Sequence, residues 1–304
     1  RYTHGDVPTG LTHAFGVDYT PDERWNFGGN IEMGVLEDKR TSSTTDRKAI
    51  GLNAGYNFGA VVYSAALEYR LDGTEAPDTT TSDRTTWLMK NNLTYQVDSD
   101  WRFLGKANFS KSTSTLGDLF SGNFTEVVLG YGYRPIDNDR LNTLMKYTYF
   151  YNVPFGDLST TDPLTGQVVG ASNPIDFIQK SHILSFDAIY DLTKRWSIGG
   201  KYAYRLGQLA QDRLNPEFFD SRASLYVLRA DWHFTHRWDA LIEGRMLDTP
   251  DAQDKRAGTL LGLYRHIGEN LKVGVGYNFT DFSDDLTDLS YNSQGVFVNF
   301  VGKI

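Results

Sequence analysis

The feature that most limits how this chain can fold is a period-two alternation of apolar and polar residues along nearly its whole length. In the segment 101–110, for example, Trp101 and Phe103 share one face, whereas Arg102 and Lys106 share the other. Successive side chains of a β-strand point to opposite faces, while a helix would repeat every 3.6 residues. The pattern therefore predicts an all-β protein whose strands each have one apolar and one polar face.

About fifteen such segments occur, and most are long for β-strands. Strands of ordinary globular proteins have a mode near 5–6 residues, whereas a tilted membrane-spanning strand needs about 9–11. No apolar run approaches the roughly 20 residues of a membrane helix. The expected strands cover residues 11–20, 25–36, 47–58, 60–71, 85–97, 101–112, 124–135, 140–153, 181–192, 196–208, 222–234, 238–247, 257–267, 271–281 and 293–304.

The connections between these segments alternate between short and long. Short turns are expected around 21–24, 98–100, 137–139, 193–195 and 268–270, and longer polar loops near 37–46, 72–84, 113–123, 154–180, 209–221, 248–256 and 282–292. Short turns on one side and long loops on the other are typical of outer-membrane barrels. The sequence thus predicts one domain over 1–304, a transmembrane antiparallel β-barrel of about 14–16 strands.

Aromatic residues recur with a spacing of six across the short turns. Amphipathic rings collect where hydrocarbon meets the lipid headgroups, because the ring is apolar and its N–H or O–H seeks water. We therefore expect one aromatic belt at the short-turn rim. Its members are Tyr19 with Trp25, Tyr95 with Trp101, Tyr190 with Trp196, and Trp232 with Trp238.

The polar faces of the strands carry charges of both signs. A membrane barrel turns its apolar face to lipid and keeps polar groups inside, because each unpaired buried charge costs several kcal/mol. Two interpretations stay open, a lumen filled by salt-bridge ladders and a basic constriction that favours anions. The basic residues expected to face the lumen are Arg102, Lys106, Lys146, Lys201, Arg205, Arg229 and Arg245.

The sequence offers little for catalysis or cofactor binding. The chain has no cysteine, its six histidines lack the spacing of a zinc hydrolase, and it has no haem-attachment or phosphate-loop motif. We therefore expect no enzymatic activity, no catalytic residue and no cofactor. The one weak metal candidate is the acidic run Asp281, Asp284, Asp285 and Asp288, which lacks the ligand spacing of an EF-hand.

Two stretches of the sequence resemble a known kind of barrel. The first is Val128–Arg140 running on to Lys146–Pro154, and the second is Lys272–Asp288. Both are similar to the C-terminal, porin-like outer-membrane barrel of very large, multidomain bacterial surface proteins. The resemblance implies an anchor at the cell surface of a Gram-negative bacterium, forming the C-terminal part of a longer chain. The sequence departs from such barrels in its last residue, Ile304, where an aromatic residue is usual.

Three functions follow as hypotheses. The first is a membrane anchor or assembly component for a larger surface protein or complex. The second is a porin-like passive channel with a mild preference for anions, and the third is a sheath around an electron-transfer partner. Expected partners are outer-membrane lipid and lipopolysaccharide, with further domains of the chain or other proteins, and no nucleic acid.

The strand count raises a question of closure. The segments beginning at residues 11 and 293 run in the same direction, whereas bacterial single-chain barrels close antiparallel with an even number of strands. An open edge in lipid would leave backbone groups unpaired at several kcal/mol each. We therefore expect a further strand before Leu11, supplied mostly from upstream residues or another chain, to complete sixteen.

Overall fold

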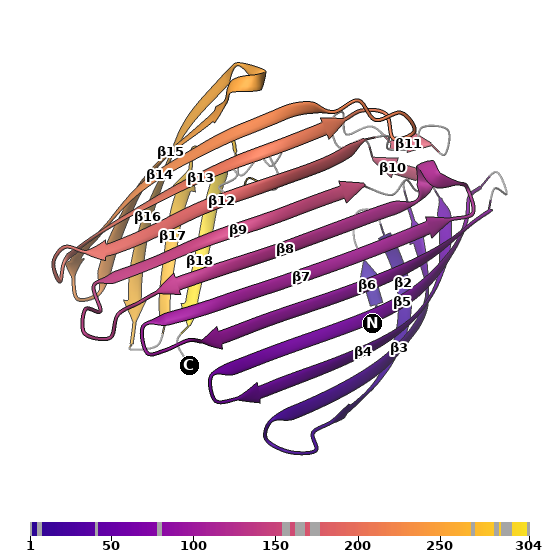
Figure 1. Ribbon diagram of the computed structural model, residues 1–304, viewed down its shortest axis with the longest axis horizontal. Coiled ribbons are helices and arrows are strands. Elements are labelled where there is room, and N and C mark those ends of the chain that lie inside the picture. The colour runs from indigo at the N-terminus through magenta and orange to yellow at the C-terminus, as the bar shows by residue number, and fades with distance from the viewer. Residues whose placement is uncertain are drawn as a thin grey trace.

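A single sixteen-stranded antiparallel sheet dominates the fold and curls round like the wall of a barrel (Figure 1). It is seen in a computed structural model that describes residues 2–4, 8–39, 42–77, 81–153, 159–161, 168–170, 177–268, 271–282, 286 and 294–302. Each strand pairs with its neighbour in sequence, except that β9 pairs with β12. A separate hairpin, β10–β11, lies between those two strands in sequence.

The strands of the large sheet are mostly long, although the first has three residues and the last two have eight each. They are β1 (Tyr2–His4), β2 (Pro8–Tyr19), β3 (Trp25–Asp38), β4 (Ser43–Phe58), β5 (Val61–Glu75), β6 (Thr81–Gln96), β7 (Trp101–Ser114), β8 (Gly122–Tyr133), β9 (Leu141–Val153), β12 (Ile178–Asp191), β13 (Trp196–Ala210), β14 (Phe219–Thr235), β15 (Trp238–Thr249), β16 (Asp254–Ile267), β17 (Leu271–Asn278) and β18 (Gly295–Gly302). The hairpin comprises β10 (Ser159–Thr161) and β11 (Val168–Gly170), and the two 3-10 turns are η1 (Asp118–Phe120) and η2 (Pro250–Ala252). No helix in the described part of the chain is long and apolar enough to cross a membrane.

The expected antiparallel all-β architecture is confirmed, and each of the fifteen expected strands has its counterpart. A three-residue strand, β1, precedes Leu11, and in it Tyr2 pairs with Leu11 and His4 with Thr9. Within the described residues, it does not complete the closed sixteen-stranded barrel expected from the sequence. Among the described residues, no ladder joins β18 to β1 or β2. The sheet therefore has two edges in the part of the chain that the structure describes.

The expected lengths of the long loops are wrong in most places, because the strands continue further. The loop expected over 37–46 is a connection between Asp38 and Ser43, since β3 and β4 pair up to these two residues. Polar side chains support this extension: Thr45 and Thr74 hydroxyls lie 3.0 Å apart across β4 and β5. Backbone pairing beyond the membrane needs no apolar side chain, so hydrophobic alternation alone underestimates strand length.

The two faces of the sheet differ sharply in exposure. Leu228 on β14 is 75% exposed, whereas Val227 beside it points the other way and is 8% exposed. Exposed apolar residues recur at alternate positions on every long strand, from Phe15 on β2 to Phe300 on β18. The opposite face holds the buried polar residues, among them Ser181 at 0% exposure. We call the exposed apolar face the outer face and the polar face the inner wall.

A small apolar cluster lies on the inner wall. Phe282 and Leu286, from the connection after β17, are 0% and 2% exposed. They pack with a set of wall residues that we call the inner seat: Ile183, Ala203, Ala223, Leu225, Val227 and Leu247. Phe282 and Leu286 thus lie beyond β16, on the inner side of strands β12–β15.

The exposure of the outer face predicts a stability difference that depends on depth. Leu228 lies four residues from Trp232 along β14, near the middle of the apolar band, whereas Ser224 on the same face lies close to its far boundary. Leu228→Arg should lower the free energy of unfolding in lipid vesicles by about 2–4 kcal/mol and Ser224→Arg by about 0–1 kcal/mol. Denaturant titration measures both, and equal losses would contradict a lipid-facing outer face.

Candidate functional site

Ion pairs within the wall neutralise much of the inner wall's charge. Some join neighbouring strands: Arg47 Nε lies 2.7 Å from Asp72 Oδ1, and Lys106 Nζ lies 2.8 Å from Glu126 Oε2. Others join residues two apart on one strand, which share a face. These include Arg70 with Glu68, Arg229 with Asp231, and Arg245 with Glu243, at 2.5, 2.7 and 2.5 Å.

The structure places all seven basic residues named for the lumen on the inner wall. Lys106, Arg229 and Arg245 have the carboxylate partners given above. Arg102 donates two hydrogen bonds to Gln96 Oε1, at 3.0 and 2.7 Å. Lys146 stands opposite Ser185 in the β9–β12 ladder, and Lys201 stands opposite Asp187 in the β12–β13 ladder.

The seventh, Arg205, is 1% exposed and stands opposite Ile183 and Ala223, beside the inner seat. Its burial separates it from the other six, whose side chains lie along more open parts of the wall. Its guanidinium is therefore packed within the wall and is hardly accessible to a solute in the lumen.

A four-residue cluster near the short-turn end was not expected from the sequence. Asp239, at 3% exposure, accepts hydrogen bonds from His233 Nδ1 at 2.7 Å and His266 Nε2 at 2.8 Å. Lys272 Nζ lies 2.5 Å from Asp239 Oδ2, the carboxylate oxygen that His266 also contacts. We call this the Asp239 cluster, and it joins β14, β15, β16 and β17. The signal in the sequence was weak, because only the strand register brings these positions together.

The eight expected belt residues all lie on the outer face at strand ends beside short turns. Rings contact across the strands: Trp196 stacks on Trp232 at 5.4 Å between centroids, and Trp25 lies 4.6 Å from Tyr56. Trp101 lies 4.4 Å from Tyr133. Ring contacts between neighbouring strands thus extend the belt beyond the eight residues named from the sequence.

A repeated turn positions the tryptophans of the belt. In Asp22–Trp25 the Asp22 carboxylate accepts the backbone N–H groups of Arg24 and Trp25, at 2.8 and 2.9 Å. Asp98 does the same for Asp100 and Trp101, and Thr193 uses its hydroxyl for Arg195 and Trp196. Such side-chain turns fix local geometry. An Asp or Thr three residues before Trp is therefore a sequence signal that the spacing argument overlooked.

The sixth tryptophan marks the opposite boundary of the membrane. Trp87 contacts Tyr69 at 4.6 Å and lies on the outer face of β6, eight residues from Tyr95. Eight residues rise about 26 Å along a strand, or about 20 Å along the membrane normal at a tilt near 40°. The outer face therefore has aromatic residues at both edges of its apolar band.

The weak metal candidate gains no support from the described residues. Asp281 is described and exposed, whereas Asp284, Asp285 and Asp288 lie outside the described residues. Within the described part of the chain, no group of three His, Asp or Glu side chains is arranged to hold a metal ion.

Comparison with solved structures shows which fold this is. Three similar structures each have a TM-score of 0.60: the ferric citrate transporter FecA, the ferric-catecholate import receptor Fiu from E. coli K12, and the FrpB iron transporter from Neisseria meningitidis. Sequence identity is 15%, 9% and 11%, over 94%, 91% and 96% of this chain. The chain spans only 51%, 60% and 54% of those proteins. No model of a protein family and no curated protein sequence matches the chain.

The fold is that of outer-membrane β-barrels. At such low identity the similarity shows the fold alone. The cargo and partners of those proteins are therefore not assigned to this chain. The bacterial outer membrane predicted from the sequence agrees with this fold and with an outer face that is apolar between two aromatic edges.

The Asp239 cluster predicts a marked loss of stability when its carboxylate is removed. Asp239→Asn removes the counter-charge of Lys272 and replaces a carboxylate that is itself 3% exposed; because Lys272 is 29% exposed, the free energy of unfolding should fall by about 1–3 kcal/mol. Asp231→Asn on the same wall is the control, because the Asp231 side chain is 18% exposed and, among the described residues, pairs with Arg229 alone, and should lose about 1 kcal/mol or less. Equal losses in denaturant titration would contradict a structural role for the cluster.

The turn η2 should respond to acid through Asp251. Hydrogen bonds from the Arg222 side chain and then from its backbone N–H, the latter at 2.6 Å, hold the pKa of Asp251 below its ordinary value. A lowered folded-state pKa stabilises the fold above the ordinary carboxyl pKa and is lost as the pH falls through the lowered one. Wild type should therefore unfold at higher urea than Asp251→Asn near neutral pH, and the difference should be lost as the pH falls below the lowered pKa of Asp251. A difference that persists in acid would contradict the link.

Proposed function

We propose that the chain is the outer-membrane anchor of a larger surface protein or complex, and that it carries out no catalytic step. In this proposal the barrel holds the larger protein or complex at the membrane, and its lumen does not select a solute. The resemblance of two sequence stretches to anchoring barrels suggested this function, and the inner wall supports it over a selective pore.

The observation that carries the proposal is the local neutralisation of the inner wall. An anion filter needs uncompensated positive charge facing the passage. Here Lys106, Arg229 and Arg245 each have a carboxylate within 2.8 Å. Pairs formed within the wall persist without any ligand, so these cations offer little net field to a passing anion.

The position of the inner seat is a second observation that supports an anchor over an open pore. Val227 lies five residues from Trp232 and Ala223 lies nine, which places the seat about 13–23 Å above the short-turn belt, in the loop-side half of the membrane. Phe282 and Leu286 are held there, inside the wall. Side chains held at this depth on the inner wall take up part of the lumen and hinder free passage.

A passive channel is the second candidate, and the strand number favours it. Barrels of 16–18 strands enclose an aqueous channel, whereas eight-stranded barrels are filled by side chains. The similar structures are transporters of iron compounds by name, but this chain spans about half their length, so their cargo forms no part of the proposal.

Single-channel recording of the purified chain in planar bilayers tests the anchor against the channel. The anchor predicts no long-lived open step from wild type, because the connection after β17 stays on the inner seat. The double variant Phe282→Ala with Leu286→Ala should release this contact and give more frequent open steps with little ion selectivity.

Long-lived, anion-selective steps from wild type would contradict the anchor. Lys201→Gln and Lys146→Gln provide the matched test of that outcome, since neither residue is needed for the belt or the inner seat. If the selectivity disappeared in these variants, the inner wall would be a filter, and the passive channel would replace the anchor as the function.

A further inference from the structure

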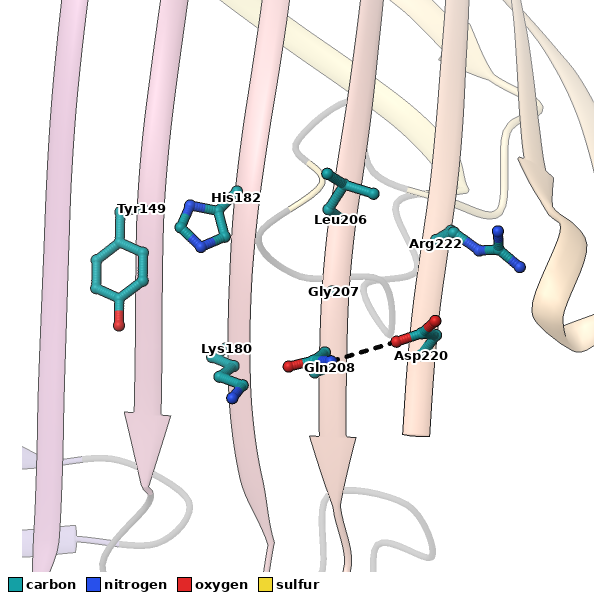
Figure 2. A pocket seen from close by; sticks show the side chains of 8 residues that line it. All are labelled: Tyr149, Lys180, His182, Leu206, Gly207, Gln208, Asp220 and Arg222. Carbon is teal, nitrogen blue, oxygen red and sulfur yellow. Dashed lines mark hydrogen bonds between the residues drawn. The ribbon is translucent and has the colours of Figure 1, made fainter. Parts of the chain in front are cut away.

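A groove on the outer face lies where the barrel leaves the membrane on the loop side. It is formed by β9, β12, β13 and β14, and Figure 2 shows Tyr149, Lys180, His182 and Arg222 among the residues that line it. Its cavity volume is about 550 Å³. This groove lies outside the barrel, so neither the inner wall nor the anchor function accounts for it.

The strand register fixes the depth of the groove in the membrane. Arg222 lies ten residues from the belt residue Trp232 along β14, on the same face. Ten residues rise about 33 Å along a strand, or about 25 Å along the membrane normal, which is the height of an outer-membrane barrel's apolar band. The groove therefore lies at the level of the lipid headgroups opposite the short-turn belt.

Directly below the groove, the same strands present exposed aliphatic side chains. Leu184, Leu206 and Leu228 are 54%, 51% and 75% exposed. Leu206 also lines the groove itself. The polar head of a lipid would thus lie against the polar groove, and its acyl chains would lie against the apolar surface below.

The groove presents cationic groups beside oxygen acceptors. Lys180 has no carboxylate partner among the described residues, and its Nζ lies 4.0 Å from the Phe218 ring centroid. Asp251 holds Arg222 through Nε and Nη2, which leaves its other guanidinium N–H groups as donors. Tyr147 Oη lies 2.7 Å from His182 Nδ1, so the other ring nitrogen of His182 is available to a ligand.

The acidic residue in the groove, Asp220, favours a ligand that carries hydroxyl groups as well as phosphate. Asp220 accepts a hydrogen bond from Gln208 Nε2 at 3.3 Å, as Figure 2 shows. A carboxylate beside Lys180 and Arg222 repels a bare phosphate, but it accepts hydrogen bonds from sugar hydroxyls. Tyr149 adds an aromatic surface suited to the apolar face of a sugar ring.

We propose that this groove binds the phosphorylated sugar headgroup of an outer-leaflet glycolipid of the lipid A type. Lys180 and Arg222 contact the phosphate, Gln208 and Asp220 contact the sugar hydroxyls, and the leucines below contact the acyl chains. The ligand is thereby distinguished from a plain anionic phospholipid, which has no sugar for Asp220, and from free phosphate, which has no acyl chain.

Binding of defined lipids to the full chain in detergent micelles tests the site. Bisphosphorylated, hexa-acylated lipid A should bind at least about tenfold more tightly than phosphatidylglycerol, and Lys180→Gln should weaken lipid A binding about tenfold, as expected for a lost charged hydrogen bond. Asp220→Asn should weaken lipid A binding, because a sugar acceptor is lost, and should not weaken phosphatidylglycerol binding, because a charge that repels phosphate is removed. Lys255→Gln is the matched control, because Lys255 is an outer-face lysine already paired with Asp248 at 3.2 Å.

Four outcomes would overturn the proposal. Equal affinity for lipid A and phosphatidylglycerol would mean a general anionic-lipid surface, and an equal effect of Lys180→Gln and Lys255→Gln would mean non-specific lipid contact. No effect of Lys180→Gln would remove the phosphate site. Displacement of lipid A by inorganic phosphate would assign the groove to the free ion. Thermal unfolding of each variant in detergent checks that the barrel is intact, and Lys180→Gln should not change it because the side chain lies at the surface.

Discussion

Every backbone N–H and C=O group that enters the hydrocarbon of a membrane must find a partner within the protein, because water is not there to supply one. The continuous antiparallel ladder from β1 to β18 satisfies this requirement for the described strands that lie between its two edges. The remaining features depend on the ladder. It fixes which side chains share a face, and so it separates the lipid-exposed leucines from the charged inner wall. It also brings together residues far apart in sequence, as with Asp239 and Lys272.

Local hydrogen bonds set the depth of the ladder in the membrane. In the repeated turn, Asp22, Asp98 or Thr193 holds the backbone of the tryptophan three residues later. The same contact therefore closes the hairpin and places an interfacial ring at a fixed height. At the other edge, Trp87 and Tyr69 play the corresponding part without a turn. Because both boundaries of the apolar band are defined, each strand position has a known depth in the membrane. On this scale the groove that contains Arg222 lies at the level of the lipid headgroups.

Much of this architecture could be predicted from the sequence, because alternation and aromatic spacing are local signals. The belt positions of Trp25 and Trp101 and the inner-wall positions of Arg229 and Arg245 follow from parity along one strand. The Asp239 cluster does not, since it depends on the register of four strands. The strand extensions near Ser43 were missed because polar residues such as Thr44 pair their backbones as well as apolar ones do. Phe282 was hidden in an acidic run, where its burial on the inner seat had no periodic signal.

The overrun of the strands beyond the membrane has a mechanical consequence. Strands of up to 17 residues exceed the span of the bilayer, so the ladder continues past the headgroups on the loop side. Antiparallel hydrogen bonds lie perpendicular to the strands. A pull on the loops along the strand direction would therefore load many hydrogen bonds at once in shear, and it would not break them one after another. The protruding rim is thus stiff along the strands, and a load applied to one loop is shared with the neighbouring strands of the sheet.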